Sequence, residues 1–379
     1  MRVYLVAGEP SGDKLGAALI RGLRTIIPGI ELRGIAGPLM QAEGMASLFP
    51  MEELSVMGIA EVLPKFRHLM RRITQTADDV VATAPDVLIT IDSPDFSLRV
   101  ARRVKAASKT RTVHYVAPTI WGWRPKRAAK LQGVVDHLLA LLPFEPPLFA
   151  PLGIACDFVG HPVVAEPEIS AENRNSFRDA HGLGKPTVCL LPGSRRGEVD
   201  RLMAGLLQAV GQADLGSQPH LVIPTLPHLR EPLERQLAGH RALIIDGADG
   251  PAEDANTLRR QAMAASDIAL AASGTVSLEL ASVGTPMVIG YDMNWATRLI
   301  IERMLLIDTV TLVNLVSETR HVEEFLGRGF VPGDMAAALT RLYADPTQQR
   351  TALEITMDRL GRGGEDPGLR AARAVLKRL

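Results

Sequence analysis

The sequence predicts an α/β protein made of two doubly wound domains that face each other across a cleft. Apolar stretches of strand length alternate with stretches of helical spacing along most of the chain, which is typical of repeated βα units around a parallel sheet. A polar segment containing Pro162 and Pro167 separates one series of strands from a second. A length of 379 residues suits two domains.

We expect the first domain over residues 1–165 and the second over residues 166–345. The strands expected in the first are Val3–Ala7, Leu32–Ala36, Asp86–Asp92, Thr112–Val116, His137–Leu142 and Phe158–Val159. Those expected in the second are Thr187–Leu191, Leu221–Pro224, Ala242–Ile245, Asp267–Ala271 and Met287–Ile289. Residues 346–379 are predicted to be C-terminal helices that pack back on the first domain.

The composition excludes several classes of protein. The 42 basic residues balance the 42 acidic ones, so no nucleic-acid partner is expected. The two cysteines have no metal-ligand spacing, and we expect no metal site. The apolar run before Gly8 is too short for a signal peptide, and no stretch reaches the ~18 apolar residues of a membrane-spanning helix. We therefore expect a cytoplasmic protein, with contact to a membrane surface left open.

The stretch from Ala271 to Gly290 is the strongest candidate for a ligand site. A predicted strand leads through a turn, Ser273, Gly274 and Thr275, into a short helix. The N-terminus of a helix has free N–H groups and a partial positive charge, which suit a phosphate. Glu279 lies one turn further on about the same face, where it could accept two sugar hydroxyls. The alternative is an ordinary helix cap followed by a surface glutamate.

A second strand-to-helix turn, over residues 191–198, belongs to the same domain. It contains Gly193 and Arg195 but lacks the G-K-[ST] of a Walker A motif. The planar guanidinium of Arg195 could bind a diphosphate through several donors. Together with the turn at Ser273, it predicts a diphosphate pocket.

Two acids end the third clear strand of the first domain. Asp92 stands at the carboxyl end of that strand, where ligands bind in doubly wound folds. Asp95 comes just before the next helix. We favour Asp92 as a general base and Asp95 as the helix N-cap, while a reversed assignment and a purely structural pair stay open.

Two further turns of the first domain are candidate acceptor or cleft sites. In the turn after the first strand, Ser11 and Gly12 are small enough to let a ligand approach the backbone, although a capped turn is the alternative. The segment after the strand at residues 112–116 places Trp121, Trp123 and Arg124 where they could bind a sugar or a phosphate.

Residues 59–76 combine apolar and basic side chains at helical spacing. The apolar positions are Leu63, Phe66, Leu69, Met70 and Ile73. Lys65, Arg67, Arg71 and Arg72 lie among them. This pattern favours an interfacial helix on an anionic membrane, and an ordinary core-facing helix with a solvated basic face is the alternative.

Taken in order, these motifs resemble the lipid A disaccharide synthase family. The resemblance runs from about residue 3 to residue 330. Its segments are AGEPSGD at Ala7–Asp13, LSVMGIAEVL at Leu54–Leu63, IDSPDF at Ile91–Phe96, WGWRPKR at Trp121–Arg127, LLPFE at Leu141–Glu145, FVGHP at Phe158–Pro162, LLPGSRRGEV at Leu190–Val199, ASGTVSLE at Ala272–Glu279 and LVNL at Leu312–Leu315. Each segment alone is a weak signal, whereas nine in order are specific.

The resemblance implies an inverting glycosyltransferase with the two-domain GT-B fold that needs neither a metal nor a cofactor. The implied donor is UDP-2,3-diacylglucosamine, and the implied acceptor is 2,3-diacylglucosamine 1-phosphate (lipid X). The products would be the β-1′,6-linked lipid A disaccharide 1-phosphate and UDP. The family acts in lipopolysaccharide synthesis in Gram-negative bacteria, so we expect peripheral association with the cytoplasmic face of the inner membrane. A homodimer stays open.

Family roles can be carried over to matching positions of this chain. The implied positions are Asp92 for the required aspartate, Arg195 and Ser273–Thr275 for UDP, Glu279 for the ribose and Asn314 for an active-site asparagine. The stretch Leu63–Ile73 falls where the family has a membrane-associating patch. This chain has Gly327 where the family commonly has a glutamine.

Two alternatives belong to other classes. Another GT-B enzyme acting on a UDP-sugar, such as a 2-epimerase or a peptidoglycan glycosyltransferase, would share the second-domain pocket. It would not require the amphipathic stretch together with IDSPDF. A non-catalytic nucleotide-sugar sensor would bind the donor and tolerate the loss of Asp92.

Overall fold

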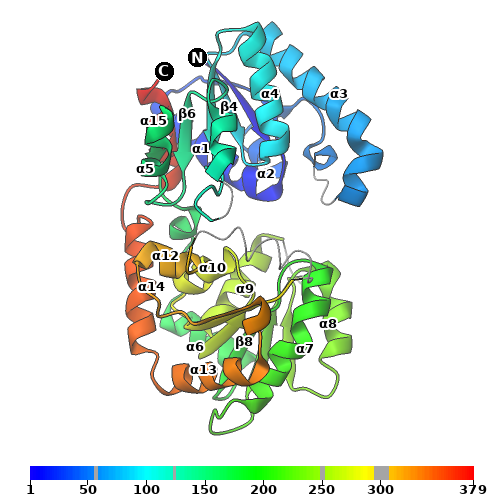
Figure 1. Ribbon diagram of the computed structural model, residues 1–379, viewed down its shortest axis with the longest axis vertical. Coiled ribbons are helices and arrows are strands. Elements are labelled where there is room, and N and C mark those ends of the chain that lie inside the picture. Colours follow the sequence, from blue (N-terminus) through cyan, green and yellow to red (C-terminus); the bar gives the residue numbers. More distant parts are fainter. Residues whose placement is uncertain (55–58, 123–124, 248–251, 294–306) are drawn as a thin grey trace. The chain divides into compact units, whose positions relative to one another are not determined.

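The structure, a computed structural model, describes residues 1–54, 59–122, 125–247, 252–293 and 307–379 (Figure 1). The chain divides into two compact units. The first unit comprises Met1–Ala165 and Leu360–Leu379, and the second comprises Glu166–Arg359. Each unit contains a parallel sheet with helices packed against it.

The described strands of the first unit form a sheet in the order β3-β2-β1-β4-β5-β6-β7, with every pair parallel. They are β1 (Arg2–Ala7), β2 (Glu31–Ile35), β3 (Ala46–Ser47), β4 (Val87–Ile91), β5 (Arg111–Tyr115), β6 (His137–Ala140) and β7 (Ala155–Phe158). Strand β4 is buried along its whole length, as expected for a parallel strand covered on both faces. The strand order reverses between β1 and β4, so the turns after these strands flank the position where ligands bind in such sheets.

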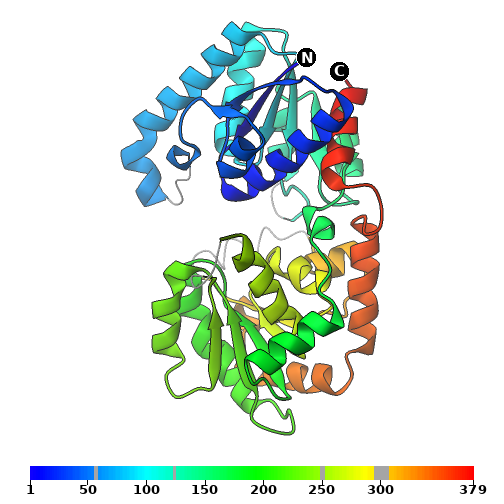
Figure 2. The same ribbon diagram turned by 180° about the vertical axis from the view of Figure 1, so that it is seen from behind.

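The helices of the first unit are α1 (Pro10–Ile26), α2 (Pro38–Ala42), α3 (Ile59–Thr83), α4 (Pro94–Ala107), α5 (Pro146–Phe149) and α15 (Pro367–Lys377). Helices α3 and α4 pack side by side (Figure 1). The chain's last helix, α15, packs along α1 (Figure 2). The two backbones approach closely there, since a Cβ atom on Gly368 would lie 2.4 Å from the carbonyl oxygen of Ala18.

The described strands of the second unit form a parallel sheet in the order β10-β9-β8-β11-β12-β13. They are β8 (Thr187–Leu191), β9 (His220–Pro224), β10 (Ala242–Ile245), β11 (Ile268–Ala271), β12 (Met287–Tyr291) and β13 (Glu324–Leu326). The described α-helices of this unit are α6 (Ala171–Ala180), α7 (Arg196–Gln212), α8 (Arg230–Gln236), α9 (Ala252–Ala264), α10 (Val276–Ser282), α12 (Leu312–Ser317), α13 (Pro332–Ala344) and α14 (Thr347–Arg359). The strand order reverses between β8 and β11.

The structure corrects the sequence predictions in three places. Strands β3 and β13 were not predicted, because two or three residues are too few to show an alternating pattern. Strand β7 begins at Ala155 rather than Phe158. The expected grouping of residues 346–379 differs from the observed division, because α14 packs on α12 and α10 of the second unit. Within the described part of the chain, no helix is long and apolar enough to cross a membrane.

Candidate active site

A cavity of about 400 Å³ lies at the carboxyl edge of the second unit's sheet. Its walls come from the turns after β8, β9 and β11 and from helix α9. The predicted residues Arg195, Ser273, Gly274, Thr275 and Glu279 all line it. The two turns that were expected to form one pocket therefore do so, because β8 and β11 are neighbours in the sheet.

The turn after β11 presents backbone N–H groups to this cavity. Gly274 has a φ of 147°, a conformation that glycine adopts far more readily than other residues. Thr275 is the N-cap of α10, and Glu279 lies in the first turn of that helix. Among the described residues, no acceptor takes a hydrogen bond from the backbone N–H of Gly274 or Thr275. Both groups can therefore donate to an anion.

The turn after β8 is stabilised by the carboxylate of Glu198, in the first turn of α7. Glu198 Oε2 accepts hydrogen bonds from the backbone N–H of Ser194 at 3.2 Å and of Arg195 at 3.3 Å. A Cβ atom on Gly193 would lie 2.4 Å from the same oxygen, so glycine makes room for the carboxylate. Because Glu198 satisfies these backbone donors, the exposed side chain of Arg195 is the group of this turn suited to a phosphate.

Arg259 on α9 is a second cation on the cavity wall that the sequence analysis missed. It stands beside Arg260, and a pair of arginines in a helix resembles an ordinary solvated face. The structure separates the two. Arg260 is 6% exposed, and its guanidinium donates to the carbonyl oxygen of Pro167 at 2.6 Å. Arg259 instead reaches the cavity, which adds positive charge opposite the turns.

Asn314 lies apart from the cavity lining. It is 1% exposed, and its amide nitrogen donates to Thr309 Oγ1 at 3.1 Å and to the carbonyl oxygen of Val322 at 2.8 Å. Its amide oxygen accepts from the backbone N–H of Val322 at 3.0 Å. The structure thus gives Asn314 the role of a clamp between α12 and the residues before β13.

In the first unit, the turn after β4 has an unusual backbone. Asp92 and Ser93 have φ angles of 50° and 44°, the left-handed region that costs such residues about 1–3 kcal/mol each and recurs at functional sites. Asp92 Oδ1 accepts a hydrogen bond from the backbone N–H of Ser93 at 2.8 Å. Helix α4 begins at Pro94 with Ser93 as its N-cap. Asp95, expected to be the N-cap, is instead an exposed residue of the first turn, because proline favours the first helical position.

The turn after β1 packs against this strained turn. A Cβ atom on Gly8 would lie 2.7 Å from Ser93 Oγ. Gly12 is buried against the carbonyl oxygen of Ile91, which brings α1 close to β4, whereas Ser11 is exposed. Asp13 is 2% exposed and accepts hydrogen bonds from the start of α2. In the structure, Gly12 packs against β4, and Asp13 fixes the start of α2 through hydrogen bonds.

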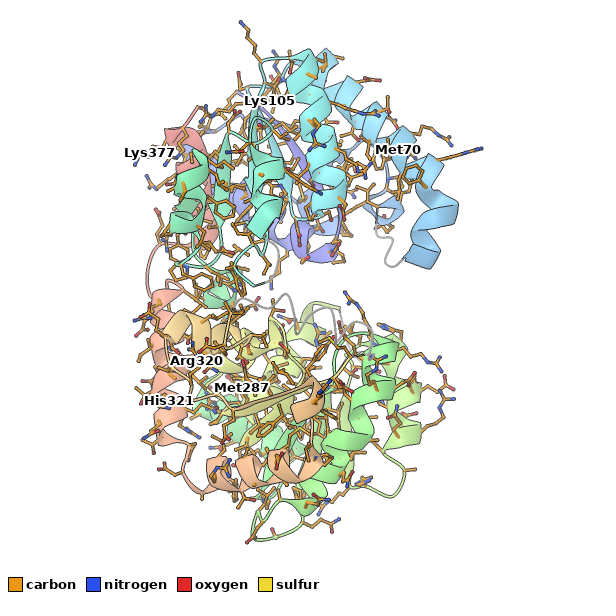
Figure 3. All side chains as sticks on the ribbon, viewed as in Figure 1. Met70, Lys105, Met287, Arg320, His321 and Lys377 are labelled. Atoms are coloured by element: carbon orange, nitrogen blue, oxygen red, sulfur yellow. The ribbon has the colours of Figure 1, made fainter. Side chains whose placement is uncertain are left out.

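A second cavity, of about 450 Å³, lies between α3 and the start of α4. Phe66, Leu69, Met70 and Ile73 form its apolar side; Met70 lies on the side of α3 that faces α4 (Figure 3). The polar side consists of Glu9, Ser93, Asp95 and Arg99. Asp95 lines this cavity, and Asp92 adjoins it through Ser93.

The predicted interfacial stretch is only partly available to a membrane. Phe66 is 49% exposed, whereas Ile73 is 3% exposed and belongs to the core of the first unit. The interpretation of Ile73 as a lipid-facing residue is wrong, because α3 meets the core at that turn. Arg72 is also engaged within the protein: it pairs with Glu53 at 2.7 Å. The side chain of Leu63 lies outside the described residues.

The aromatic segment after β5 is described only at its start. Trp121 is half-buried, and its indole Nε1 donates a hydrogen bond to Glu145 Oε1 at 3.3 Å. Trp123 and Arg124 lie outside the described residues.

Comparisons with known proteins identify the family of this chain. The family model described as Lipid-A-disaccharide synthetase matches residues 3–364. The Lipid-A-disaccharide synthase of Ruegeria pomeroyi is 56% identical over 385 residues, covering 100% of this chain and 96% of the relative.

Solved structures support the fold. A UDP-GlcNAc 2-epimerase from Neisseria meningitidis bound to UDP-GlcNAc has a TM-score of 0.68 at 16% identity, with both chains fully covered. A lipopolysaccharide outer core galactosyltransferase has a TM-score of 0.55 at 14% identity, also with both chains fully covered. The predicted GT-B type of fold is confirmed, and with the family match so is the predicted class of enzyme, a glycosyltransferase. The chain belongs to the lipid-A-disaccharide synthase family.

Proposed function

We propose that this protein transfers 2,3-diacylglucosamine from UDP-2,3-diacylglucosamine to lipid X, with inversion at the anomeric carbon. The acceptor 6-hydroxyl would attack that carbon, while the bond to the diphosphate breaks and UDP leaves with the electron pair. One displacement inverts the centre, so one general base is sufficient. The products would be the β-1′,6-linked lipid A disaccharide 1-phosphate and UDP.

We assign UDP to the cavity beside β8 and β11. The N–H groups of Gly274 and Thr275 and the guanidinium groups of Arg195 and Arg259 would stabilise the negative charge that develops on the leaving diphosphate. Glu279 would accept hydrogen bonds from the ribose hydroxyls. These donors are positively charged or backbone groups, so they can act without a metal ion.

We assign the acceptor to the cavity of the first unit, with Asp92 as the base that removes the proton of the 6-hydroxyl. The observation that carries this assignment is the cavity's combination of an apolar side from α3 with two acids, Glu9 before α1 and Asp95 at the start of α4. A sugar that carries acyl chains needs both kinds of surface. A general base that must be held in one geometry also accounts for the strained backbone at Asp92 and Ser93.

We further propose that the protein works at the cytoplasmic face of the inner membrane, where the acyl chains of both substrates reside. Phe66 is an exposed apolar side chain of α3, and α3 and its neighbour α4 also carry exposed cations, whose charge favours anionic lipids. These cations are Arg67, Arg71, Arg99, Arg102 and Arg103. The contribution of α4 was not predicted, because sequence periodicity does not show which helices are neighbours.

The assignment is tested by incubating the purified protein with UDP-2,3-diacylglucosamine and lipid X in detergent. Equal amounts of UDP and disaccharide 1-phosphate are expected. The same assay with UDP-GlcNAc alone tests the 2-epimerase alternative. Formation of a 2-epimer, or binding of UDP-sugar without any transfer, would contradict the proposal.

A further inference from the structure

Glu145 is a buried carboxylate that the proposed transfer reaction does not use. It follows β6 and is 4% exposed. Its Oε1 accepts the hydrogen bond from the indole of Trp121, and its Oε2 accepts one from the backbone N–H of Leu142 at 3.0 Å. Among the described residues, no cation forms an ion pair with it. In the part of the chain that the structure describes, its charge is compensated by indole and amide donors.

The indole of Trp121 is held at a second point. Its ring packs edge-on against Phe144, with centroids 5.4 Å apart and an angle of 87° between the planes. Trp121 follows β5 and Glu145 follows β6, and these strands are neighbours in the sheet. Both residues therefore lie at the carboxyl edge, on which the turn at Asp92 after β4 also lies. The pair anchors an aromatic side chain at the ligand-binding edge of the first unit.

The charge of Glu145 can change near neutral pH. Burial raises the pKa of its carboxyl to about 7, although the N–H groups of Leu142, Trp121 and Leu141 lower that pKa. From β7, the ionisable group that interacts with it is the thiol of Cys156. Burial raises the pKa of that thiol to about 12, so Cys156 stays neutral while Glu145 titrates.

We propose that ionised Glu145 is a positioning residue that fixes the orientation of Trp121 at the carboxyl edge of the first unit's sheet. The effect of this orientation on acceptor binding beside the turn of Asp92 rests on the proposed function. An ionised carboxylate offers only acceptors, which matches the N–H donors aimed at it. A protonated carboxyl directs an O–H towards one of them and weakens that contact. Mild acid therefore loosens Trp121.

Tryptophan fluorescence tests the anchor without any substrate. The chain contains three tryptophans, so the double variant Trp123→Phe with Trp295→Phe leaves Trp121 as the only emitter. Its emission is expected to titrate with a midpoint near pH 7. Adding Glu145→Gln, which keeps an oxygen acceptor for the indole, should abolish this titration. Cys156→Ser is the matched control and should leave the midpoint in place.

Kinetics test the consequence for the reaction. Below pH 7 the ionised fraction of Glu145 falls about tenfold per pH unit, so the KM for lipid X should rise accordingly while the donor KM stays constant. Glu145→Gln should remove this rise. Trp121→Phe keeps the ring packing but lacks the N–H, so it should also remove the rise in the KM for lipid X. This variant replaces Glu145→Gln in the experiment if Glu145→Gln does not fold.

The outcomes are distinguishable. A fluorescence titration that persists in Glu145→Gln, or an acceptor KM with the same pH dependence in all three proteins, would overturn the positioning role. Absence of transfer by the wild-type enzyme would contradict the proposed function, while the fluorescence midpoint would still decide whether Glu145 holds Trp121.

Discussion

Replacing Gly8 with alanine is expected to disturb the turn that carries Asp92. The added Cβ would lie 2.7 Å from Ser93 Oγ and 3.1 Å from Ser93 Cβ, and the next atom, in Leu54, is at 3.8 Å. The φ of Gly8 is outside the left-handed region, so alanine strains no dihedral angle. The perturbation is therefore a steric one directed at Ser93 alone.

The magnitude follows from overpacking, which typically costs about 1–3 kcal/mol. Replacing glycine also lowers the conformational entropy of the unfolded chain, which raises the free energy of unfolding by about 0.4–1 kcal/mol. The free energy of unfolding should therefore fall by roughly 0.5–2 kcal/mol. A displacement of a catalytic group by about 1 Å can lower the rate about 100-fold, so kcat should fall sharply. The donor KM should stay unchanged, because the cavity that we propose for UDP belongs to the second unit.

The assay is a double-mutant cycle with Ser93→Gly, measured by denaturant unfolding and by turnover. Ser93→Gly removes both clashing atoms, so Gly8→Ala should become neutral or stabilising in that background. The coupling energy should be about 1–3 kcal/mol. Gly211→Ala, at a position with no atom within 4 Å of the added Cβ, is the control. An equal penalty for Gly8→Ala in both backgrounds would refute the reasoning.

Three further predictions concern other parts of the chain. Arg259→Gln should weaken UDP binding about 10- to 100-fold, because a charged donor to the diphosphate is lost; calorimetry that finds unchanged affinity would remove Arg259 from the donor site. Asp13→Ala should lower the free energy of unfolding by roughly 3 kcal/mol, because three backbone N–H groups at the start of α2, one of them from its N-cap Gly37, lose their acceptor. Denaturant unfolding measures this, and a loss below about 1 kcal/mol would contradict it. Burial lowers the pKa of His114 to about 4, so the unfolded state binds the proton first and stability falls as pH drops from about 6.5 to 4. His114→Gln should reduce that slope by about 1.4 kcal/mol per pH unit, and an unchanged slope would argue against a neutral buried imidazole.

The sequence predicted the parallel sheets well because their strands are continuous apolar runs. Strand β4 is the clearest example, since both of its faces are covered. The cavity beside β8 and β11 was also predictable in part, because the turns after these two strands contain glycine at the point where the chain reverses. The neighbouring positions of β8 and β11 then bring the turns together.

The remaining features depend on contacts that lie far apart in the chain. Asp13 stands in a motif that resembles a ligand site, but its partners are the backbone N–H groups that begin α2. The spacing of Phe66 and Ile73 shows that they share a helix face. It does not show that Phe66 is exposed while Ile73 is buried in the core. The anchor at Glu145 likewise depends on the pairing of β5 with β6, which joins two segments more than 20 residues apart.

The role of Asp92 is the central claim, and a comparison of wild type with Asp92→Asn and Asp95→Asn tests it most directly. Disaccharide formation in detergent and UDP affinity would be measured for all three proteins. Loss of a general base should lower kcat about 100- to 10,000-fold in Asp92→Asn, with UDP affinity retained and Asp95→Asn much less affected. Full activity in Asp92→Asn, with the large loss in Asp95→Asn instead, would contradict the account and identify Asp95 as the base.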